Sequence, residues 1–272
     1  MVSKLEMEND SIYSRPRFVE RLDDCYFYHS TELPQYGLIN GEWDLRRGIE
    51  RYLGSFDFRD KRVLDVGTAS GFLAFWMERQ GAEVIGYDLS EKYNWDRVPY
   101  GGGIGPQESA AWKEHIRKTN NSFWFTRSLL QSKVQMVYGT VYDIPKEIGP
   151  VDIATFGSIL LHLRDPFLAL QSALRITTEA VIVTEGFTSL RSIPMTLLSL
   201  IKPIVLFLPN ARKGSLPESW WMLPPRTIVE FLRILGFPKT NVTYHFQRYR
   251  GAPLQRMLMY TVVGRRMSQW KV

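Results

Sequence analysis

The chain has 272 residues, 44% of them apolar, and a formal net charge of +6. This length suits one large α/β domain with additions, or at most two domains. Cys25 is the only cysteine, which excludes an internal disulfide and favours a reducing cytoplasm. Residues 1–14 are polar and acidic, so they lack the apolar core of a signal peptide.

The positive charge is concentrated towards the end of the chain. No Asp or Glu follows Glu230. A basic surface can bind nucleic acid or an anionic membrane. We interpret this one as a solvated face around the last strands, because no RNA-binding signature accompanies it. The basic residues after Glu230 are Arg233, Lys239, Arg248, Arg250, Arg256, Arg265, Arg266 and Lys271.

Residues 1–54 are predicted to form an N-terminal arm, which ends in a loop and a helix over residues 38–54. Trp43 and Arg46 lie in this arm, just ahead of the first predicted strand. Two interpretations remain for Trp43, a contact to substrate or a buried anchor of the arm. We take both residues as candidate substrate contacts.

Residues 61–90 contain the motif around which the chain is organised. An apolar run at 63–66 leads into a tight turn, Gly67–Gly71. An amphipathic segment, Phe72–Arg79, follows, and then a second apolar run that ends on Asp88. This order of strand, turn, helix, strand and acid predicts a βαβ unit for a nucleoside-containing cofactor, with the acid accepting the ribose hydroxyls.

The turn distinguishes between two kinds of cofactor. Its spacing, Gly67-x-Ala69-x-Gly71, does not fit the dinucleotide fingerprint. Asp65 would repel a pyrophosphate but favours a cationic ligand with an ammonium group. The stretch resembles motif I of the class I S-adenosylmethionine-dependent methyltransferases, D/E-x-G-x-G-x-G, with Ala69 at the middle glycine; the alternative is an α/β turn without a ligand. The resemblance implies S-adenosylmethionine as cofactor, with contacts from Asp65, Gly67, Thr68, Ala69, Gly71, Asp88 and Leu89.

An insertion over about residues 89–110 follows the second strand. Glycines and prolines predict irregular structure up to Ser109. The segment begins beside the ribose end of the cofactor, so Trp95 is a candidate wall of the substrate site, along with Tyr93. An exposed surface loop is the alternative.

A helix is predicted over Ala110–Gln131 and a third strand over Val134–Tyr138. In methyltransferases the turn after this strand frames the adenine. The resemblance therefore implies an adenine contact from the backbone of Val141 and Tyr142, or from Asp143.

The fourth predicted strand, Val151–Phe156, is nearly all apolar, as expected for a parallel strand covered on both faces. Ligands bind at the carboxyl ends of such strands, so Phe156, Gly157 and Ser158 are candidate cofactor contacts, and the segment that begins at Gly157 is expected to face the transferred methyl group. A helix at 167–174 and a fifth strand at 180–185 complete the pattern.

His162 and Arg164 are the candidate catalytic residues after this strand. Histidine titrates near neutral pH, so His162 suits a general base, or it is a structural residue at a helix start. Arg164 would hold an anionic acceptor, or pair with Asp165. The acids and histidines lack metal-ligand spacing, so we expect no metal site.

The segment FGSILLHLRDP at 156–166 is similar to one in the bacterial tRNA wobble-uridine carboxymethyltransferases and their relatives. The likeness runs from about Trp43 to Glu185. Those enzymes have a further N-terminal domain, for which we expect no room here, and they use a carboxylated cofactor. We carry over the fold and methyl-transfer chemistry, but not the tRNA acceptor.

The segment Ile193–Pro209 is nearly all apolar, but it is too short to span a bilayer and Lys202-Pro203 interrupts it. We expect it to cap the active site; the alternative is a patch that touches a membrane or a lipid substrate. Trp220 and Trp221 follow as candidate substrate contacts. A helix at 224–235 and two strands, near 241–246 and 257–263, end the chain.

The predicted fold is α/β, with a Rossmann-like seven-stranded methyltransferase sheet. This sheet is mostly parallel with a C-terminal antiparallel strand and has helices on both faces. The methyltransferase domain spans 55–272, with insertions at about 89–110 and 188–223.

The predicted function is transfer of a methyl group to O or N of a small molecule, in the cytoplasm: a natural product, a sugar or a lipid-like metabolite. The alternatives are a tRNA-modifying enzyme and a non-catalytic module that binds a membrane surface or a partner.

Overall fold

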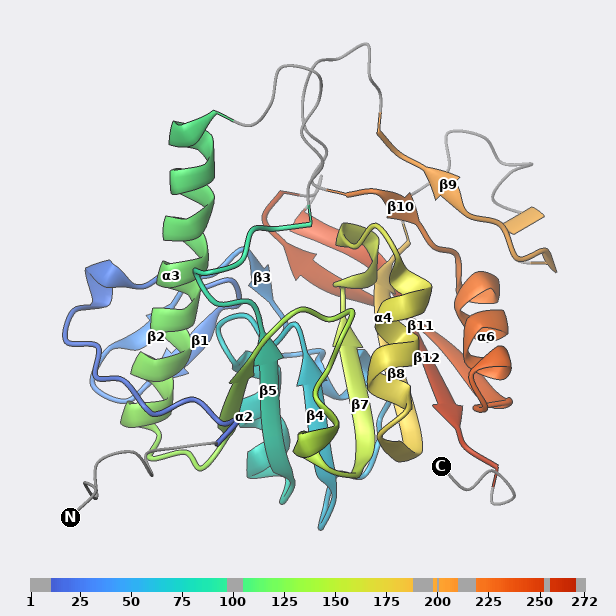
Figure 1. The fold of residues 1–272 in the computed structure, drawn as a ribbon, viewed down its shortest axis with the longest axis horizontal. Helices are drawn as coiled ribbons and strands as arrows, with labels where there is room; N and C mark the ends of the chain where they lie inside the picture. Colours follow the sequence, from blue (N-terminus) through green and yellow to red (C-terminus); the bar gives the residue numbers. More distant parts are fainter. Residues whose placement is uncertain are drawn as a thin grey trace, which may run out of the picture.

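The computed structural model describes residues 11–96, 105–187, 198–199, 201–209, 219–251 and 255–267. Its centre is an eight-stranded sheet in the order β3-β11-β12-β8-β7-β4-β5-β6 (Figure 1). The strands are β3 (Trp43–Asp44), β4 (Arg62–Val66), β5 (Glu83–Asp88), β6 (Gln135–Tyr138), β7 (Val151–Gly157), β8 (Thr177–Gly186), β11 (Lys239–Tyr249) and β12 (Arg256–Arg265). Two small antiparallel pairs are separate from it: β1 (Thr31–Leu33) with β2 (Gly37–Ile39), and β9 (Leu206–Phe207) with β10 (Trp221–Met222).

The predicted sheet is confirmed. Strands β6, β5, β4, β7 and β8 are parallel, and β12 runs antiparallel between β8 and β11. The eighth strand is an addition, because β3 pairs with the end of β11, Trp43 opposite Tyr249. A strand of two residues leaves no alternating pattern in a sequence, so this edge strand was not expected.

Helices cover both faces of the sheet because successive residues of a strand point to opposite sides. On β4, Val63 packs in one cluster with Tyr52 and Phe75, whereas Leu64 packs in another with Leu170 and Ile228. The helices of the first face are α1 (Ile49–Tyr52), α2 (Phe72–Arg79) and α3 (Pro106–Leu129). Those of the second face are α4 (Pro166–Leu174) and α6 (Pro225–Ile234).

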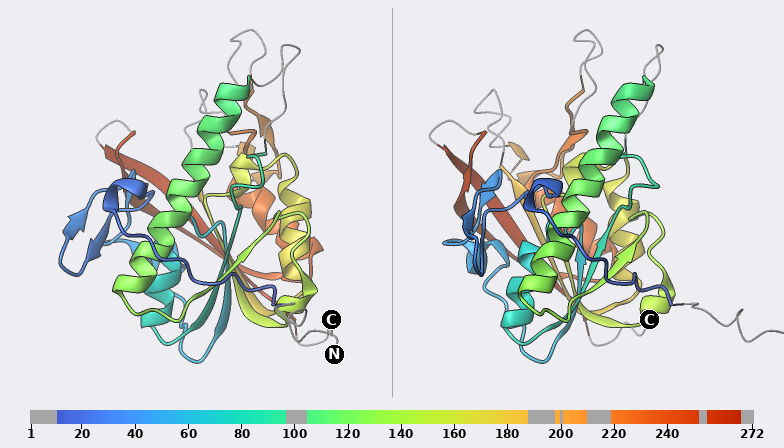
Figure 2. Two further views of the ribbon diagram at one scale, coloured as in Figure 1. Left: turned by 60° about the vertical axis from the view of Figure 1, so that its left-hand side comes forward. Right: turned by 90° about the vertical axis from the view of Figure 1, so that its left-hand side faces the viewer.

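Helix α3 starts earlier than predicted. Irregular structure was expected up to Ser109, but the helix begins at Pro106. The fixed φ of proline and its missing N–H suit the first turn of a helix, so this proline starts a helix instead of preventing one. Figure 2 shows the N-terminal half of α3 projecting beyond the sheet. Residues 97–104 of the expected insertion lie outside the described residues.

The N-terminal arm runs along α3 and then joins the sheet. A short 3-10 helix, η1 (Leu22–Asp24), lies beside α3, where Asn121 Nδ2 donates to Asp24 O at 2.8 Å. The Trp43 ring is buried and stacks on Tyr249 at 4.4 Å between centroids. Trp43 therefore anchors the arm to the sheet, which was one of its two predicted roles.

The expected cap at 193–209 lies partly outside the described residues, as do most residues of the insertion predicted at 188–223. In the described remainder of the cap, Ile201 is 70% exposed and Phe207 is 60% exposed. No helix in the described part of the chain combines the length and apolar character needed to cross a bilayer.

Candidate active site

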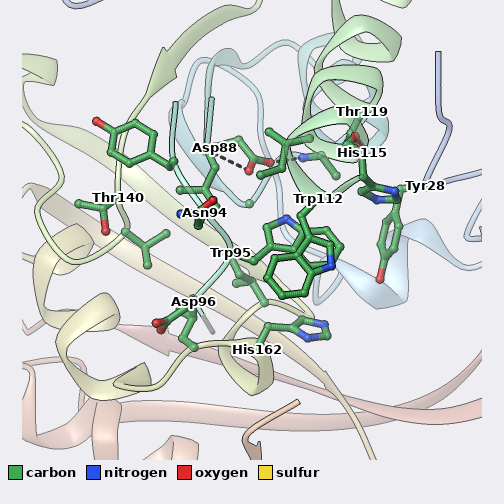
Figure 3. Close-up of a pocket in the computed structure, with 18 of the residues that line it drawn as sticks. Tyr28, Asp88, Asn94, Trp95, Asp96, Trp112, His115, Thr119, Thr140 and His162 are labelled. Atoms are coloured by element: carbon green, nitrogen blue, oxygen red, sulfur yellow. Dashed lines mark hydrogen bonds between the residues drawn. The ribbon is translucent and has the colours of Figure 1, made fainter. Parts of the chain in front are cut away.

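A cavity of about 780 Å³ lies at the carboxyl edge of the parallel strands. The segments that follow β4, β5, β6 and β7 form one side of it, and α3 and the N-terminal arm contribute to another (Figure 3). Of the predicted cofactor contacts, eight line this cavity: Gly67, Ala69, Asp88, Leu89, Val141, Tyr142, Gly157 and Ser158.

The turn after β4 faces the cavity with little side-chain bulk. Gly67 has a φ of +76°, and a Cβ there would lie 2.5 Å from Ile159 Cδ1. Ala69 has a φ of +49°, in the left-handed region that glycine adopts without cost. The turn therefore keeps the conformation of a glycine at the position where the motif departs from the family pattern. Gly71, with a φ of +84°, precedes the first turn of α2 and does not line the cavity.

Asp65 does not reach the cavity, which corrects its expected role beside a cationic ligand. Its side chain is buried, and its two oxygens accept hydrogen bonds from Thr68 Oγ1 at 2.7 Å and Thr155 Oγ1 at 2.6 Å. Burial raises the pKa of this carboxyl, while the two hydroxyls oppose the shift. Asp65 thus links the turn, through Thr68, to Thr155 on β7. Neither Asp65 nor Thr68 lines the cavity.

Asp88 ends β5 inside the cavity, as predicted. Its Oδ2 accepts from Ala69 N and its Oδ1 from Leu89 N, both at 2.7 Å (Figure 3). Burial raises the pKa of Asp88 to about 6. Each carboxylate oxygen keeps a second lone pair, so both remain able to accept a ligand hydroxyl.

The expected adenine end is formed by Leu89, Thr140, Val141 and Tyr142, which line the cavity. Asp143 does not, because its exposed carboxylate pairs with Arg175 at 3.0 Å. Of the two alternatives for the adenine contact, the structure therefore favours the backbone of Val141 and Tyr142 over the Asp143 side chain.

The end of β7 brings Gly157, Ser158 and His162 to the cavity. Ser158 has a φ of +54°, and its Oγ lies 3.2 Å from Tyr52 Oη. His162 ends the 3-10 helix η3 (Leu160–His162) and is half-buried. Phe156 was a predicted cofactor contact, but it is 1% exposed and packs in the core, because alternate strand residues face opposite sides.

Glu185 is a buried acid behind this wall. It lies at the end of β8, and its Oε1 accepts from Leu160 N at 2.9 Å. Burial raises the pKa of Glu185 to about 8, so this carboxyl is largely protonated at neutral pH. The contact fixes η3, and with it the backbone that carries His162.

Arg164 pairs with Asp96 and not with its neighbour Asp165. The Asp96 carboxylate accepts from Arg164 N at 2.7 Å, from Arg164 Nε and from the Tyr142 phenol. Asp96 O also accepts from Trp220 Nε1 at 2.8 Å. Asp165 instead caps α4, accepting from Leu168 N. Through Asp96, the insertion therefore contacts three other segments that line the cavity, those of Tyr142, Arg164 and Trp220.

Helix α3 supplies a wall that sequence reasoning missed. Its residues recur every three or four positions, the spacing that places them on one helix face. That spacing was a usable signal, but no candidate site residue was predicted on this helix. In the structure His115 lies between Tyr26 and Trp95, with ring centroids 4.3 Å and 5.2 Å away. The α3 residues that line the cavity are Trp112, His115, Ile116, Thr119 and Asn120.

The six substrate candidates divide into two groups. Tyr93, Trp95 and Trp220 line the cavity. Trp43, Arg46 and Trp221 do not. Trp43 is the anchor described above, and the other two also have partners elsewhere. Arg46 Nε pairs with Asp44 at 2.8 Å, and Trp221 Nε1 donates to Arg164 O at 3.2 Å.

Residues 40–234 match the family model described as a methyltransferase domain. The chain belongs to this methyltransferase family. It is an enzyme that depends on S-adenosylmethionine, the cofactor expected from the sequence. This family match does not identify the chain as a member of the wobble-uridine subgroup expected from the sequence. A comparison with curated proteins gave no match.

Solved structures are similar to this chain at low sequence identity. The crystal structure of EvdMO1 is 16% identical with a TM-score of 0.50; the match covers 85% of this chain and 43% of that one. The N-terminal domain of EvdMO1 with SAH bound is 14% identical, with a TM-score of 0.49 and coverage of 88% and 90%. Magnesium protoporphyrin IX methyltransferase from Synechocystis PCC 6803 with bound SAH is 13% identical, with a TM-score of 0.47 and coverage of 82% of each chain.

The lining of the cavity fits S-adenosylmethionine. Asp88 offers two buried acceptor oxygens for ribose hydroxyls. Leu89 and Val141 offer apolar surface for a base, and Gly67 presents backbone without a side chain at the cavity wall. Among the described residues, no group of acids, histidines or cysteines has the arrangement of a metal site.

Proposed function

We propose that this methyltransferase transfers the methyl group to oxygen or nitrogen of a small organic acceptor. The observation that supports this most is the cavity, whose volume of about 780 Å³ falls within the range of small-molecule sites. Tryptophans from three separate segments, Trp95, Trp112 and Trp220, line it. Aromatic walls with a few polar groups suit a compact acceptor of mixed polarity.

Bound S-adenosylmethionine supplies an electrophilic methyl group. We assign its contacts to Gly67, Ala69, Asp88, Leu89, Val141, Tyr142, Gly157 and Ser158, which all line the cavity. The protein's own contribution is to orient the acceptor and to remove its proton.

His162 is our candidate for the proton acceptor. It lines the cavity at the end of β7, beside the expected position of the methyl group. A ring nitrogen would take the proton from the acceptor hydroxyl or amine as the new bond forms. Arg164 is not assigned to an anionic acceptor, because Asp96 already occupies its guanidinium.

The test uses labelled S-adenosylmethionine with small-molecule and RNA fractions of an extract from the source organism. We expect label in the small-molecule fraction, and a strong loss of transfer in Trp220→Ala. The matched control is Trp221→Ala, because Trp221 is the next residue but lies outside the cavity. Transfer of label to RNA alone would contradict the proposal.

A lipid-like acceptor is the second candidate, favoured by the exposed apolar residues near the cavity. Phe207 is 60% exposed, and its ring lies 5.2 Å from that of Trp221 and 6.3 Å from that of Trp220, a cavity residue. The same patch supports the alternative of a membrane-surface module. Flotation with liposomes tests both: a protein that stays in the soluble fraction argues against membrane contact.

The tRNA acceptor remains a weaker alternative. Part of the basic C-terminal charge is used within the fold, since Arg233 pairs with Glu230 and Arg265 with Glu179. Arg266 donates to two backbone carbonyls, Thr177 O and Leu174 O. Binding of tRNA that is absent even at low salt would remove this alternative.

A further inference from the structure

One end of the cavity contains a carboxylate that the proposed reaction does not use. Glu42 lines the cavity and accepts a hydrogen bond on Oε1 from the Tyr26 phenol. Its backbone is held by the sheet, because Arg250 N donates to Glu42 O at 3.0 Å next to the pairing of β3 with β11. The carboxylate is therefore fixed in position.

Glu42 has no basic partner among the described residues, where it forms no ion pair. Arg164, a cation that lines the same cavity, pairs with Asp96. Burial lowers the pKa of the neighbouring His115 and so disfavours its charged form, although the nearby Glu42 opposes this shift. The Glu42 carboxylate thus lies in a half-buried site without an ion-pair partner among the described residues.

Aromatic rings lie near the Glu42 carboxylate, beginning with Tyr26, whose phenol donates to it. Tyr28 and Trp95 line the same cavity, and His115 contacts both Tyr26 and Trp95. Figure 3 places Tyr28, Trp112 and His115 on the side of the cavity away from Thr140. Aromatic faces attract organic cations, and a carboxylate adds an ion pair.

We propose that Glu42 binds the ammonium group of a ligand in this cavity. The inference rests on the proposed function, since it concerns ligands of the same site. Two sources share this chemistry, the amino-acid end of S-adenosylmethionine and an acceptor that is an amine. Glu42 replaces Asp65 as the acid that meets a cationic ligand, because Asp65 is sealed beneath the turn.

The test compares Glu42→Gln with the wild type by calorimetry in two arms. The first arm measures S-adenosylhomocysteine, which has the amino-acid end of the cofactor. The second measures benzylamine against benzyl alcohol, with S-adenosylhomocysteine present. Loss of a charge-assisted contact is expected to weaken binding about tenfold. Weaker S-adenosylhomocysteine binding assigns the ammonium to the cofactor. If S-adenosylhomocysteine binding is unchanged but the variant loses a wild-type preference for benzylamine over benzyl alcohol, the ammonium group belongs to the acceptor.

Glu32→Gln is the matched control, because Glu32 is an exposed glutamate of β1 outside the cavity. Tyr26→Phe is the second variant, and it should give a smaller loss in the same arm by releasing the Glu42 carboxylate. The proposal is overturned if Glu42→Gln changes neither arm. Failure of the wild type to bind S-adenosylhomocysteine would instead overturn the assignment of the cofactor site, so the two failures are distinguishable.

Discussion

Asp96 is predicted to control how quickly the cofactor product leaves. Its Oδ2 accepts from both Tyr142 Oη and Arg164 N, and its Oδ1 from Arg164 Nε. Asp96→Asn keeps one acceptor oxygen and converts the other to a donor, so at least one contact becomes donor facing donor. The negative charge opposite Arg164 is also lost.

The expected cost follows from the contacts that Asp96 makes. The Arg164 side chain is 54% exposed, so we assign under 1 kcal/mol to the lost charge pair. The asparagine oxygen can keep the two donors of Oδ2, so the amide group faces Arg164 Nε, and this donor–donor contact raises the sum to about 2 kcal/mol. This energy corresponds to release of S-adenosylhomocysteine about 30-fold faster than from the wild type. Stopped-flow fluorescence is a suitable assay, since Trp95, Trp112 and Trp220 line the cavity.

The matched control for this prediction is Asp143→Asn. Asp143 is also a carboxylate paired with an arginine, but it lies outside the cavity and its side chain is 83% exposed. We expect wild-type release from this control. Release from Asp96→Asn at the wild-type rate would contradict this prediction, because the contacts of Asp96 would then not limit release.

Three further predictions concern the acids and the turn. The pKa of Asp88 is about 6, so affinity for S-adenosylhomocysteine should fall about tenfold per unit below that pH in calorimetry, and Asp88→Asn should remove this dependence. The folded-state pKa of Glu185, about 8, exceeds its ordinary value of 4.5, so the extra proton stabilises the fold at low pH and this stability is lost as pH rises towards 8. Glu185→Gln should therefore gain in melting temperature over the wild type between about pH 5 and pH 9; a constant difference would contradict this. Gly67→Ala should cost ~2 kcal/mol or more in urea unfolding, because its Cβ would meet Ile159. Gly37→Ala, at a φ of +66° with open space, should cost only ~1 kcal/mol; equal costs would refute the steric argument.

The sheet was predictable because each parallel strand is an apolar run bounded by turn residues. Val63 and Leu64 face opposite helical layers, so neither position tolerates a polar residue and the run is visible in the sequence. The cofactor turn was predictable for the same local reason. Gly67 and Gly71 have positive φ angles, and a glycine in a tight turn already indicates this backbone conformation.

The rest of the site depends on contacts between distant segments. Asp65 has the spacing of a ligand contact in the sequence. Its carboxylate is nevertheless occupied by the hydroxyl of Thr155, which is 90 residues away along the chain. Asp96 carried no local signal, because its partners Tyr142 and Arg164 come from two other loops. His115 has one ring neighbour from the arm, Tyr26, and one from the insertion after β5, Trp95. Such side-chain pairings are not encoded by spacing along one element.

The cavity at the carboxyl edge is expected to bind S-adenosylmethionine through Asp88. The decisive measurement is a calorimetric titration of the wild type and Asp88→Ala with S-adenosylmethionine. We expect saturable binding by the wild type with one ligand per chain. We also expect affinity at least about tenfold weaker in Asp88→Ala, because charge-assisted hydrogen bonds to the ribose are lost. Absence of binding by the wild type, or equal affinity of the two proteins, would contradict this expectation.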